Sequence, residues 1–165
     1  MNADKRKKLS REAYVIRKKL LETIQNAGSG HIGGSMSIAE ILSVLYFEEM
    51  KINPENPDMQ DRDRLVLSKG HCSPALYATL ALKGFFSIEH LSSFRNMESD
   101  LSGHVEIHVP GVDMSSGSLG QGLSVGLGMA LFAKNKGYKN RAFVILGDGE
   151  IQEGQIWEAA MAAGY

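Results

Sequence analysis

The chain of 165 residues has a net charge of −1 and contains 43% hydrophobic residues, which predicts one globular domain with a substantial core and gives no indication of nucleic-acid binding. Its single cysteine, Cys72, excludes an internal disulfide. Because no apolar run approaches the roughly 18 residues of a membrane span and no signal-peptide pattern precedes the first helix, we expect a cytoplasmic protein that binds no membrane.

The first fifty residues are predicted to be helical on both sides of a glycine-rich loop. Apolar residues recur at steps of three and four, as on one face of an amphipathic helix, at Leu9, Ala13, Ile16, Leu20 and Ile24. Gly28 is predicted to end this helix, and the loop GSGHIGGS follows. Ser37 and Glu40 have the spacing of a capping box, which predicts the start of a second helix. The apolar face of that helix is predicted at Ile38, Ile41, Leu42 and Leu45.

Two short apolar runs, residues 64–68 and 141–146, predict buried strands. Ser73, as the cap, and Pro74, at the first position, are predicted to begin a helix that ends at Gly84. Further helices are expected over residues 87–94, 120–136 and 153–163, and loops over 52–63 and 97–118. The glycine spacing of Gly122 and Gly126 would allow another part of the backbone to approach closely. Helices that alternate with buried strands predict an α/β fold with a parallel sheet flanked by helices.

Asp148 follows the second predicted strand directly, in the sequence Gly-Asp-Gly. Ligands of parallel sheets gather outside the carboxyl ends of the strands, and the flanking glycines allow a ligand to come close to the backbone. The start of the next helix offers unpaired amides to a phosphate, and a carboxylate oxygen suits a hard cation such as magnesium or calcium. The alternative is a plain strand-to-helix turn in which the aspartate acts as a cap.

Three histidines, His31, His71 and His104, each follow a glycine in a predicted loop or at its edge. A histidine changes its charge near neutral pH, so histidines on loops can move protons or bind anions. The alternative for each one is a structural role. His90 is predicted to lie on the surface of a helix, and His108 has no predicted role.

Three other kinds of site are weaker interpretations of this sequence. A zinc site is disfavoured because Gly103 and Pro110 interrupt any helix that would bring His104 and His108 to one face. Cys72 is adjacent to His71, but neighbouring residues rarely point at each other, and a small buried cysteine is the favoured interpretation. The glycines at 117–122 do not match a dinucleotide fingerprint, and no strand leads into them.

Four motifs in this order together resemble the thiamine-diphosphate-dependent transketolases, in particular the N-terminal half that some prokaryotes encode as a separate subunit. The motifs are AGSGHIGGSMSIAEIL, DRLVLSKGHCSPALYATL, PGVDMSSGSLGQGLSVGLGMAL and GDGEIQEGQIWEA. The resemblance covers nearly the whole chain, from about Arg11 to Tyr165. It implies the thiamine-diphosphate-binding fold and, within it, part of the diphosphate domain.

The resemblance also implies roles for individual residues. Asp148 would bind Mg²⁺ or Ca²⁺, and Gly149 would contact the diphosphate of thiamine diphosphate. Glu153 would support the cofactor site from near a subunit contact. The pyrimidine ring of the cofactor would meet the backbone of Gly117 and Leu119.

The same resemblance gives the three loop histidines a place in catalysis. His31 and His104 would contact hydroxyls of the donor sugar, and His71 would lie beside the diphosphate. The family commonly has proline after the histidine that corresponds to His104, whereas this chain has Val105. The implied reaction is transfer of a two-carbon ketol unit from a ketose phosphate to an aldose phosphate, as in the pentose phosphate pathway of carbohydrate metabolism.

The family's cofactor motif continues beyond the position of Tyr165 to an asparagine that supplies a second metal ligand. The pyrimidine-binding domain, which carries the glutamate that activates the cofactor, is also absent from these 165 residues. We therefore expect residues 1–165 to be the N-terminal part of a diphosphate-binding domain that is inactive alone. Its expected partner is a C-terminal transketolase subunit, within a homo- or hetero-oligomer. The alternatives are a deoxyxylulose phosphate synthase, which matches less well, and a non-catalytic fragment that only binds a partner.

Overall fold

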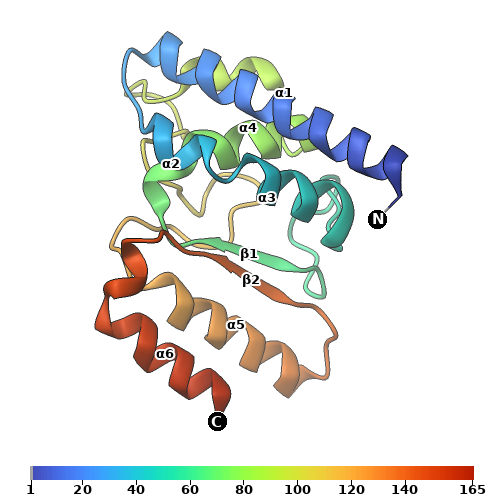
Figure 1. Cartoon of the computed structure of the whole chain (residues 1–165), viewed down its shortest axis with the longest axis vertical. Coiled ribbons are helices and arrows are strands. Elements are labelled where there is room, and N and C mark those ends of the chain that lie inside the picture. Colours follow the sequence, from blue (N-terminus) through green and yellow to red (C-terminus); the bar gives the residue numbers. More distant parts are fainter. Residues whose placement is uncertain (1) are drawn as a thin grey trace.

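A parallel sheet of two strands lies at the centre of the computed structural model, which describes residues 2–165 (Figure 1). Strand β1 (Arg64–Leu67) pairs in parallel with β2 (Ala142–Ile145), with Arg64 opposite Ala142 and Leu67 opposite Ile145. One face of the sheet is covered by the helices α1 (Ala3–Ala27), α2 (Ile32–Met36), α3 (Ala39–Val44) and α4 (Ser73–Lys83). The other face is covered by α5 (Gly122–Lys136), against which α6 (Gly154–Gly164) packs. The predicted α/β fold with a parallel sheet is confirmed.

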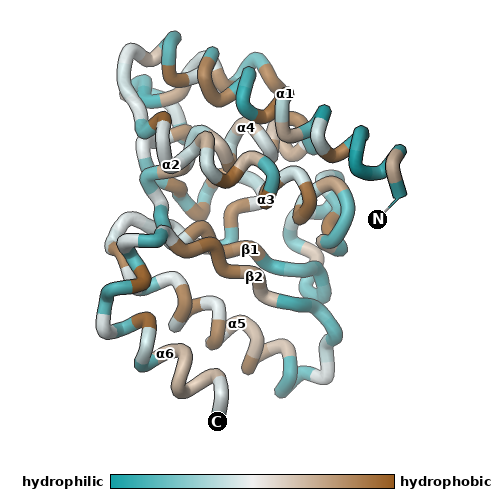
Figure 2. The backbone as a smooth tube through the Cα atoms, viewed as in Figure 1, coloured by the Kyte–Doolittle hydropathy of each residue, from teal (hydrophilic) through white to brown (hydrophobic). Residues whose placement is uncertain are grey.

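The main core lies between the sheet and the layer of α1, α3 and α4. All five apolar residues of the predicted stripe on α1 are buried, and α4 is buried over nearly its whole length. Figure 2 shows both strands as hydrophobic where they run side by side. Burying this apolar surface is the main favourable contribution to folding, and it fixes the carboxyl ends of both strands relative to the helices around them.

Two helix starts differ from the sequence prediction. The prediction of a capping box at Ser37 and Glu40 is wrong. Part of the predicted glycine-rich loop forms α2, and the next helix begins only at Ala39. The Ser37 hydroxyl instead donates to the carbonyl of Gly34 at 2.8 Å, and Glu40 pairs with Arg17 of α1. Ile41, expected on the buried face, is 47% exposed.

The start of α4 is displaced by one residue from its predicted position. Cys72 precedes the helix, Ser73 is its first residue, and Pro74 is its second. The Ser73 hydroxyl does not cap the helix. It donates to the carbonyls of Ser102 at 3.2 Å and Gly103 at 2.9 Å, so that it fastens the long loop beside α4. The short helix expected near residues 87–94 is a 3₁₀ helix (Ile88–Ser93).

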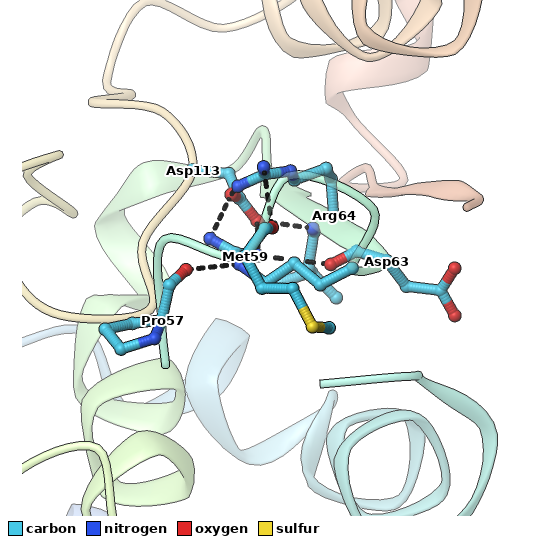
Figure 3. Close-up of polar contacts among 7 residues, drawn as sticks. Pro57, Met59, Asp63, Arg64 and Asp113 are labelled. Atoms are coloured by element: carbon cyan, nitrogen blue, oxygen red, sulfur yellow. Dashed lines mark hydrogen bonds and ion pairs between the residues drawn. The ribbon is translucent and has the colours of Figure 1, made fainter. Parts of the chain in front are cut away.

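A buried ion cluster lies at the amino end of β1, away from the carboxyl ends of the strands (Figure 3). Asp113 accepts two hydrogen bonds from Arg62, at 2.7 and 3.1 Å, and one from Arg64 at 3.0 Å. The backbone amide of Leu65 also donates to Asp113, at 2.8 Å. The side chains of Arg62 and Asp113 are only 5% and 3% exposed. This cluster fixes the predicted loop of residues 97–118 to the sheet.

Glycines of α5 face the sheet, as the spacing of Gly122 and Gly126 predicted. A Cβ atom at Gly126 would overlap the Val144 side chain of β2, and one at Gly122 would overlap Ser68 at the end of β1. Gly128, two residues further along the same helix, faces open space. The close approach of α5 to the strands therefore depends on the absence of side chains at positions 122 and 126.

This difference predicts opposite effects for two matched substitutions in α5. Gly126→Ala should lower the free energy of unfolding by about 1–3 kcal/mol, because the added methyl group overpacks against Val144. Gly128→Ala should raise it by about 0.5–1 kcal/mol, because alanine favours the helix and nothing opposes the methyl group. Urea unfolding of both variants, followed by circular dichroism, measures the two changes. Equal effects at the two positions would contradict this packing of α5 on the strands.

Candidate functional site

A cavity of about 430 Å³ opens at the carboxyl ends of β1 and β2. It lies where the sequence predicted a ligand, since parallel strands present their carboxyl ends at one edge of the sheet. The segment 68–69 leaves β1 there, and the segment 147–150 leaves β2. The cavity is lined by Gly33, Gly34, Ser37, Lys69, His71, Leu119, Gly147, Asp148, Gly149 and Glu150.

Asp148 and Gly149 form the open side of this cavity. The carboxylate of Asp148 is exposed and forms no hydrogen bond or ion pair with any of residues 2–165, and no atom would obstruct a Cβ at Gly149. A 3₁₀ turn (Glu150–Gln152) follows directly, and α6 begins only at Gly154. The amides nearest to Asp148 in sequence therefore belong to this turn, and not to the long helix that the sequence predicted.

Glu150 connects three segments beneath the cavity, a role that no sequence pattern indicated. The residue is 3% exposed. One carboxylate oxygen accepts hydrogen bonds from the Ser68 hydroxyl and from the amide of Gly120, the latter at 2.9 Å. The other oxygen accepts from the amide of Gly147 at 2.9 Å. Glu150 thereby holds the ends of both strands and the turn before α5 in one arrangement.

Lys69 is a second buried charge at the cavity, also missed from the sequence. Only 7% of the residue is exposed. Its ammonium group donates to the carbonyl of Gly34 and to the hydroxyl of Ser37, both at 3.2 Å. Within residues 2–165, no carboxylate forms an ion pair with Lys69. A lysine placed directly after a buried strand is a sequence signal that could have drawn attention to it.

The structure brings the three predicted loop histidines together beside this cavity. The ring of His31 lies 5.1 Å from that of His71 and 6.3 Å from that of His104, measured between ring centroids. His71 also lines the cavity that contains Asp148. The histidines come from the loop before α2, the turn after β1 and the long loop after residue 97, so only the fold brings them together.

The surroundings of His71 favour its neutral form. Burial lowers the pKa of His71, and the nearby charges of His31, Lys69 and His104 lower it further, against an opposing effect of Glu150. A neutral imidazole has one nitrogen that can accept a proton or a hydrogen bond. His71 is therefore able to act as a proton acceptor at neutral pH.

His104 is positioned through its backbone. The phenol of Tyr77, buried in the core, donates to the His104 carbonyl at 2.9 Å, and the Ser102 hydroxyl donates to the same oxygen at 2.6 Å. The amide of Val105 donates to the carbonyl of Gly70 at 3.3 Å. A proline at this position would have no such donor, so Val105 adds a link between the His104 loop and the turn that carries His71.

The other three predicted site residues lie around the same region. A Cβ at Gly117 would be 3.3 Å from the ring of His104, and Leu119 lines the cavity while 42% of its surface is exposed. Glu153 packs against Gly120: a Cβ atom added at Gly120 would lie 3.1 Å from the Cβ of Glu153. Gly120 has a φ of 87°, a conformation that favours glycine. Leu119 thus contributes to the cavity wall, whereas Gly117 and Glu153 do not line the cavity.

The remaining histidines lie in a separate contact. His90 lies 2.5 Å from a carboxylate oxygen of Asp100, and His108 hydrogen-bonds to the backbone carbonyl of the same residue at 3.1 Å. Across residues 2–165, no group of three or more histidine, cysteine or acidic side chains is arranged to hold a metal ion. In the same residues, no helix combines the length and the apolar character needed to cross a membrane.

Comparison with known proteins identifies relatives that match nearly the whole chain. A family model described as "Transketolase, thiamine diphosphate binding domain" matches residues 9–165. The chain is 54% identical over 157 residues to the 6-deoxy-6-sulfo-D-fructose transketolase subunit SqwG of Clostridium sp. (strain MSTE9), covering 94% of this chain and 57% of that protein. It is 49% identical over 146 residues to an apulose-4-phosphate transketolase subunit of Phocaeicola vulgatus, covering 88% of this chain and 52% of that protein. The chain thus spans about half the length of these two relatives.

Solved structures give the same result for the fold. The chain superimposes on the transketolase from Campylobacter jejuni with a TM-score of 0.91 and 38% identity, covering 99% of this chain and 27% of that one. The transketolase from Leishmania mexicana matches with a TM-score of 0.88 and 36% identity, covering 94% of this chain and 25% of that one. The predicted fold class is confirmed by these neighbours.

Proposed function

The chain belongs to the transketolase family of thiamine diphosphate binding domains, and on this premise we propose that it holds thiamine diphosphate and a divalent cation for ketol transfer. The reaction would move a two-carbon ketol unit from a ketose phosphate to an aldose phosphate. The observation that supports this proposal most is the cavity at the strand ends, where Asp148, Lys69 and His71 share one space.

The residues of the cavity fit a diphosphate with its cation. The exposed carboxylate of Asp148 would hold Mg²⁺ or Ca²⁺, whose preferred ligands are oxygens. Gly149 leaves room for the diphosphate to approach the backbone, since a Cβ there would meet no atom within 4 Å. One carboxylate is a partial metal site, so we propose that the other protein ligand comes from outside these residues. Gly117 and Leu119 would meet the pyrimidine end, and Glu153 would support the site from its edge.

Thiamine diphosphate, when bound, would supply the electron sink for breaking the carbon–carbon bond beside a ketone, chemistry that protein side chains lack. The chain's own residues would bind the sugar and handle its protons. The rings of His31 and His104, near each other on two loops, would hydrogen-bond donor hydroxyls. His71, whose lowered pKa favours the neutral form, would accept a proton at its free ring nitrogen.

A partner subunit would complete the active site. The Clostridium and Phocaeicola relatives are both named as transketolase subunits, and the chain covers 57% and 52% of their lengths. We propose that the missing parts of the diphosphate domain and the pyrimidine-binding domain come from further sequence and from a C-terminal subunit, in an oligomer. The holoenzyme is this chain together with those parts. Its place in the cytoplasm and in the pentose phosphate pathway remains a prediction.

The function is tested by ketol transfer and by substitution of Asp148. The holoenzyme should transfer a ketol unit from a ketose phosphate to an aldose phosphate, and residues 1–165 alone should not. In the holoenzyme, Asp148→Asn should raise the magnesium concentration for half-saturation by about tenfold or more, because it removes the negative charge that offsets the metal while keeping the side-chain shape. Titration of magnesium at fixed thiamine diphosphate, followed by activity and by calorimetry, measures this change.

Asp58→Asn is the matched control, since Asp58 is an exposed aspartate of the loop before β1. It should leave the magnesium requirement unchanged. A holoenzyme without ketol transfer would overturn the proposed reaction. An unchanged magnesium requirement in Asp148→Asn would show instead that Asp148 is not a metal ligand.

A further inference from the structure

The imidazole of His104 is held only through the backbone of its loop. Its ring centroid lies 6.3 Å from that of His31, and a Cβ atom at Gly117 would be 3.3 Å from the ring. Among residues 2–165, however, every hydrogen bond of His104 involves its backbone amide or carbonyl. Both ring nitrogens are therefore free for a ligand. The direction in which the ring points depends on what fixes the backbone.

Helix α4 fixes this backbone with two side chains that lie one helical turn apart. Ser73 and Tyr77 are separated by four residues, a spacing that places both on one face of the helix. The Ser73 hydroxyl donates to the carbonyls of Ser102 at 3.2 Å and Gly103 at 2.9 Å. The Tyr77 phenol donates to the carbonyl of His104 at 2.9 Å. Three successive carbonyls of the loop are thus bound to one face of α4.

Tyr77 is a rigid anchor for this contact. Its side chain is fully buried, and its ring meets that of the buried Phe94 edge to face, with 6.3 Å between the ring centroids. A close-packed aromatic ring has few alternative positions. Burial also raises the pKa of the Tyr77 phenol, so the hydroxyl keeps its proton and remains a donor at neutral pH.

The same helix also carries a second histidine of the site. His71 lies in the 3₁₀ turn Gly70–Cys72, which continues directly into α4. The amino end of α4 thus carries His71 through the chain itself, and Tyr77 holds His104 from one turn further along. One buried helix therefore sets the positions of two of the three histidines relative to each other.

We propose that Tyr77 and Ser73 are positioning residues for ketol transfer, which direct the imidazole of His104 toward the donor sugar by holding its loop. This inference rests on the proposed function, and it concerns two residues to which neither the resemblance nor the comparisons give a role. A misplacement of about 1 Å at a reacting group can lower a rate by about 100-fold. Because Ser102 would still donate to the His104 carbonyl, we expect a smaller effect, of about tenfold, when the Tyr77 hydroxyl is lost.

The competing explanation is that Tyr77 only stabilises the core. In that case, loss of its hydroxyl would loosen the domain as a whole, and the effect on catalysis would be the same whether or not position 104 carries an imidazole. A double-mutant cycle separates the two explanations, because it measures how far the effect of one residue depends on the other.

The experiment measures kcat/KM for a ketose phosphate donor in the holoenzyme, with and without the imidazole at position 104. Tyr77→Phe keeps the ring and removes only the hydroxyl. It should lower kcat/KM by about tenfold in the wild-type background, but by less than about twofold in the His104→Ala background, where no imidazole is left to position. The dissociation constant of thiamine diphosphate, measured by calorimetry, should change by less than about twofold, because His104 would contact the sugar.

Tyr46→Phe is the matched control, since Tyr46 is 2% exposed and belongs to the same core as Tyr77. It should match the wild type in kcat/KM. If Tyr77→Phe does not fold, Ser73→Ala replaces it, because this variant removes the other donor of α4 to the loop. Its effect should depend on His104 in the same way.

The outcomes distinguish the positioning role from the proposed function. An equal fall of kcat/KM in both backgrounds, or no fall in either, overturns the positioning role of α4. The same conclusion follows if His104→Ala alone leaves kcat/KM unchanged, since there would then be no contribution of the imidazole to position. A wild-type holoenzyme without any ketol transfer would instead overturn the proposed function itself.

Discussion

Replacing Asp113 by alanine should lower the free energy of unfolding of this chain by about 3–5 kcal/mol, the range expected when one partner of a buried ion pair is removed. The side chain of Arg62, only 5% exposed, would be left without a carboxylate. The amide of Leu65 and one donor of Arg64 would lose their acceptor as well. Because domains of this size are stable by only about 5–15 kcal/mol, the variant should unfold at a much lower urea concentration.

Two further variants separate the buried charge from the loss of a side chain. Asp58→Ala removes an exposed aspartate of the loop before β1 and should change the stability by less than about 0.5 kcal/mol. Arg62→Met combined with Asp113→Leu removes both buried charges and should be more stable than Asp113→Ala alone. Urea unfolding followed by circular dichroism measures all three. If Asp113→Ala were as stable as Asp58→Ala, the ion cluster would not contribute to the fold.

The sequence predicted those features of the fold that repeat locally or follow from sheet topology. The stripe on α1 was predictable because burial on one helix face imposes steps of three and four from Leu9 to Ile24. Asp148 could be placed because a parallel sheet brings strand ends to one edge. Gly126 could be interpreted because a glycine at that spacing in a helix has few uses besides close packing.

The features that were missed or wrong depend on partners far apart in the chain. Ser37 and Glu40 carry the local pattern of a capping box, yet Glu40 pairs with Arg17, 23 residues away, and α2 occupies the preceding turn. Glu150 contacts Ser68 across 82 residues, and Lys69 contacts Gly34 across 35. No periodicity links such positions, so only the folded chain reveals these contacts.

The candidate site was predictable in its residues more than in its arrangement. The glycine before each of His31, His71 and His104 singled these residues out, and the resemblance to transketolases implied a role for each. The structure places the rings of His71 and His104 at 5.1 and 6.3 Å from that of His31. The resemblance could not imply how Val105 replaces a proline, because the effect depends on the carbonyl of Gly70 lying 3.3 Å from the Val105 amide. The roles of the histidines toward substrate stay predictions until a ligand is bound.

Glu150 is expected to have the second large effect, on both stability and cofactor binding. Glu150→Ala would leave the Ser68 hydroxyl and the amides of Gly120 and Gly147 without their acceptor in a buried place. Each unsatisfied donor costs about 1–3 kcal/mol, so we expect a loss of about 3–5 kcal/mol after partial relaxation. Urea unfolding of the chain measures this loss.

Glu150→Gln tests whether the carboxylate acts by its geometry or only by filling space. The amides of Gly120 and Gly147 donate to different oxygens of Glu150, and glutamine offers an acceptor to only one of them. The other amide would face the NH₂ group, so the variant should lose about 1–3 kcal/mol although its shape is unchanged. Glu158→Gln, at an exposed position of α6, is the matched control and should lose less than about 0.5 kcal/mol.

Glu150→Gln should also weaken the binding of thiamine diphosphate to the holoenzyme, since Gly147 directly precedes the proposed metal ligand Asp148. Freeing the Gly147 amide from Glu150 would let the loop that carries Asp148 and Gly149 leave its position at the strand ends. We expect the dissociation constant of thiamine diphosphate to rise by about tenfold, and that of thiamine to rise less, because thiamine lacks the diphosphate and the metal that this loop would contact. A stable Glu150→Gln variant with wild-type affinity would show that Glu150 fills the space beneath the cavity without positioning it.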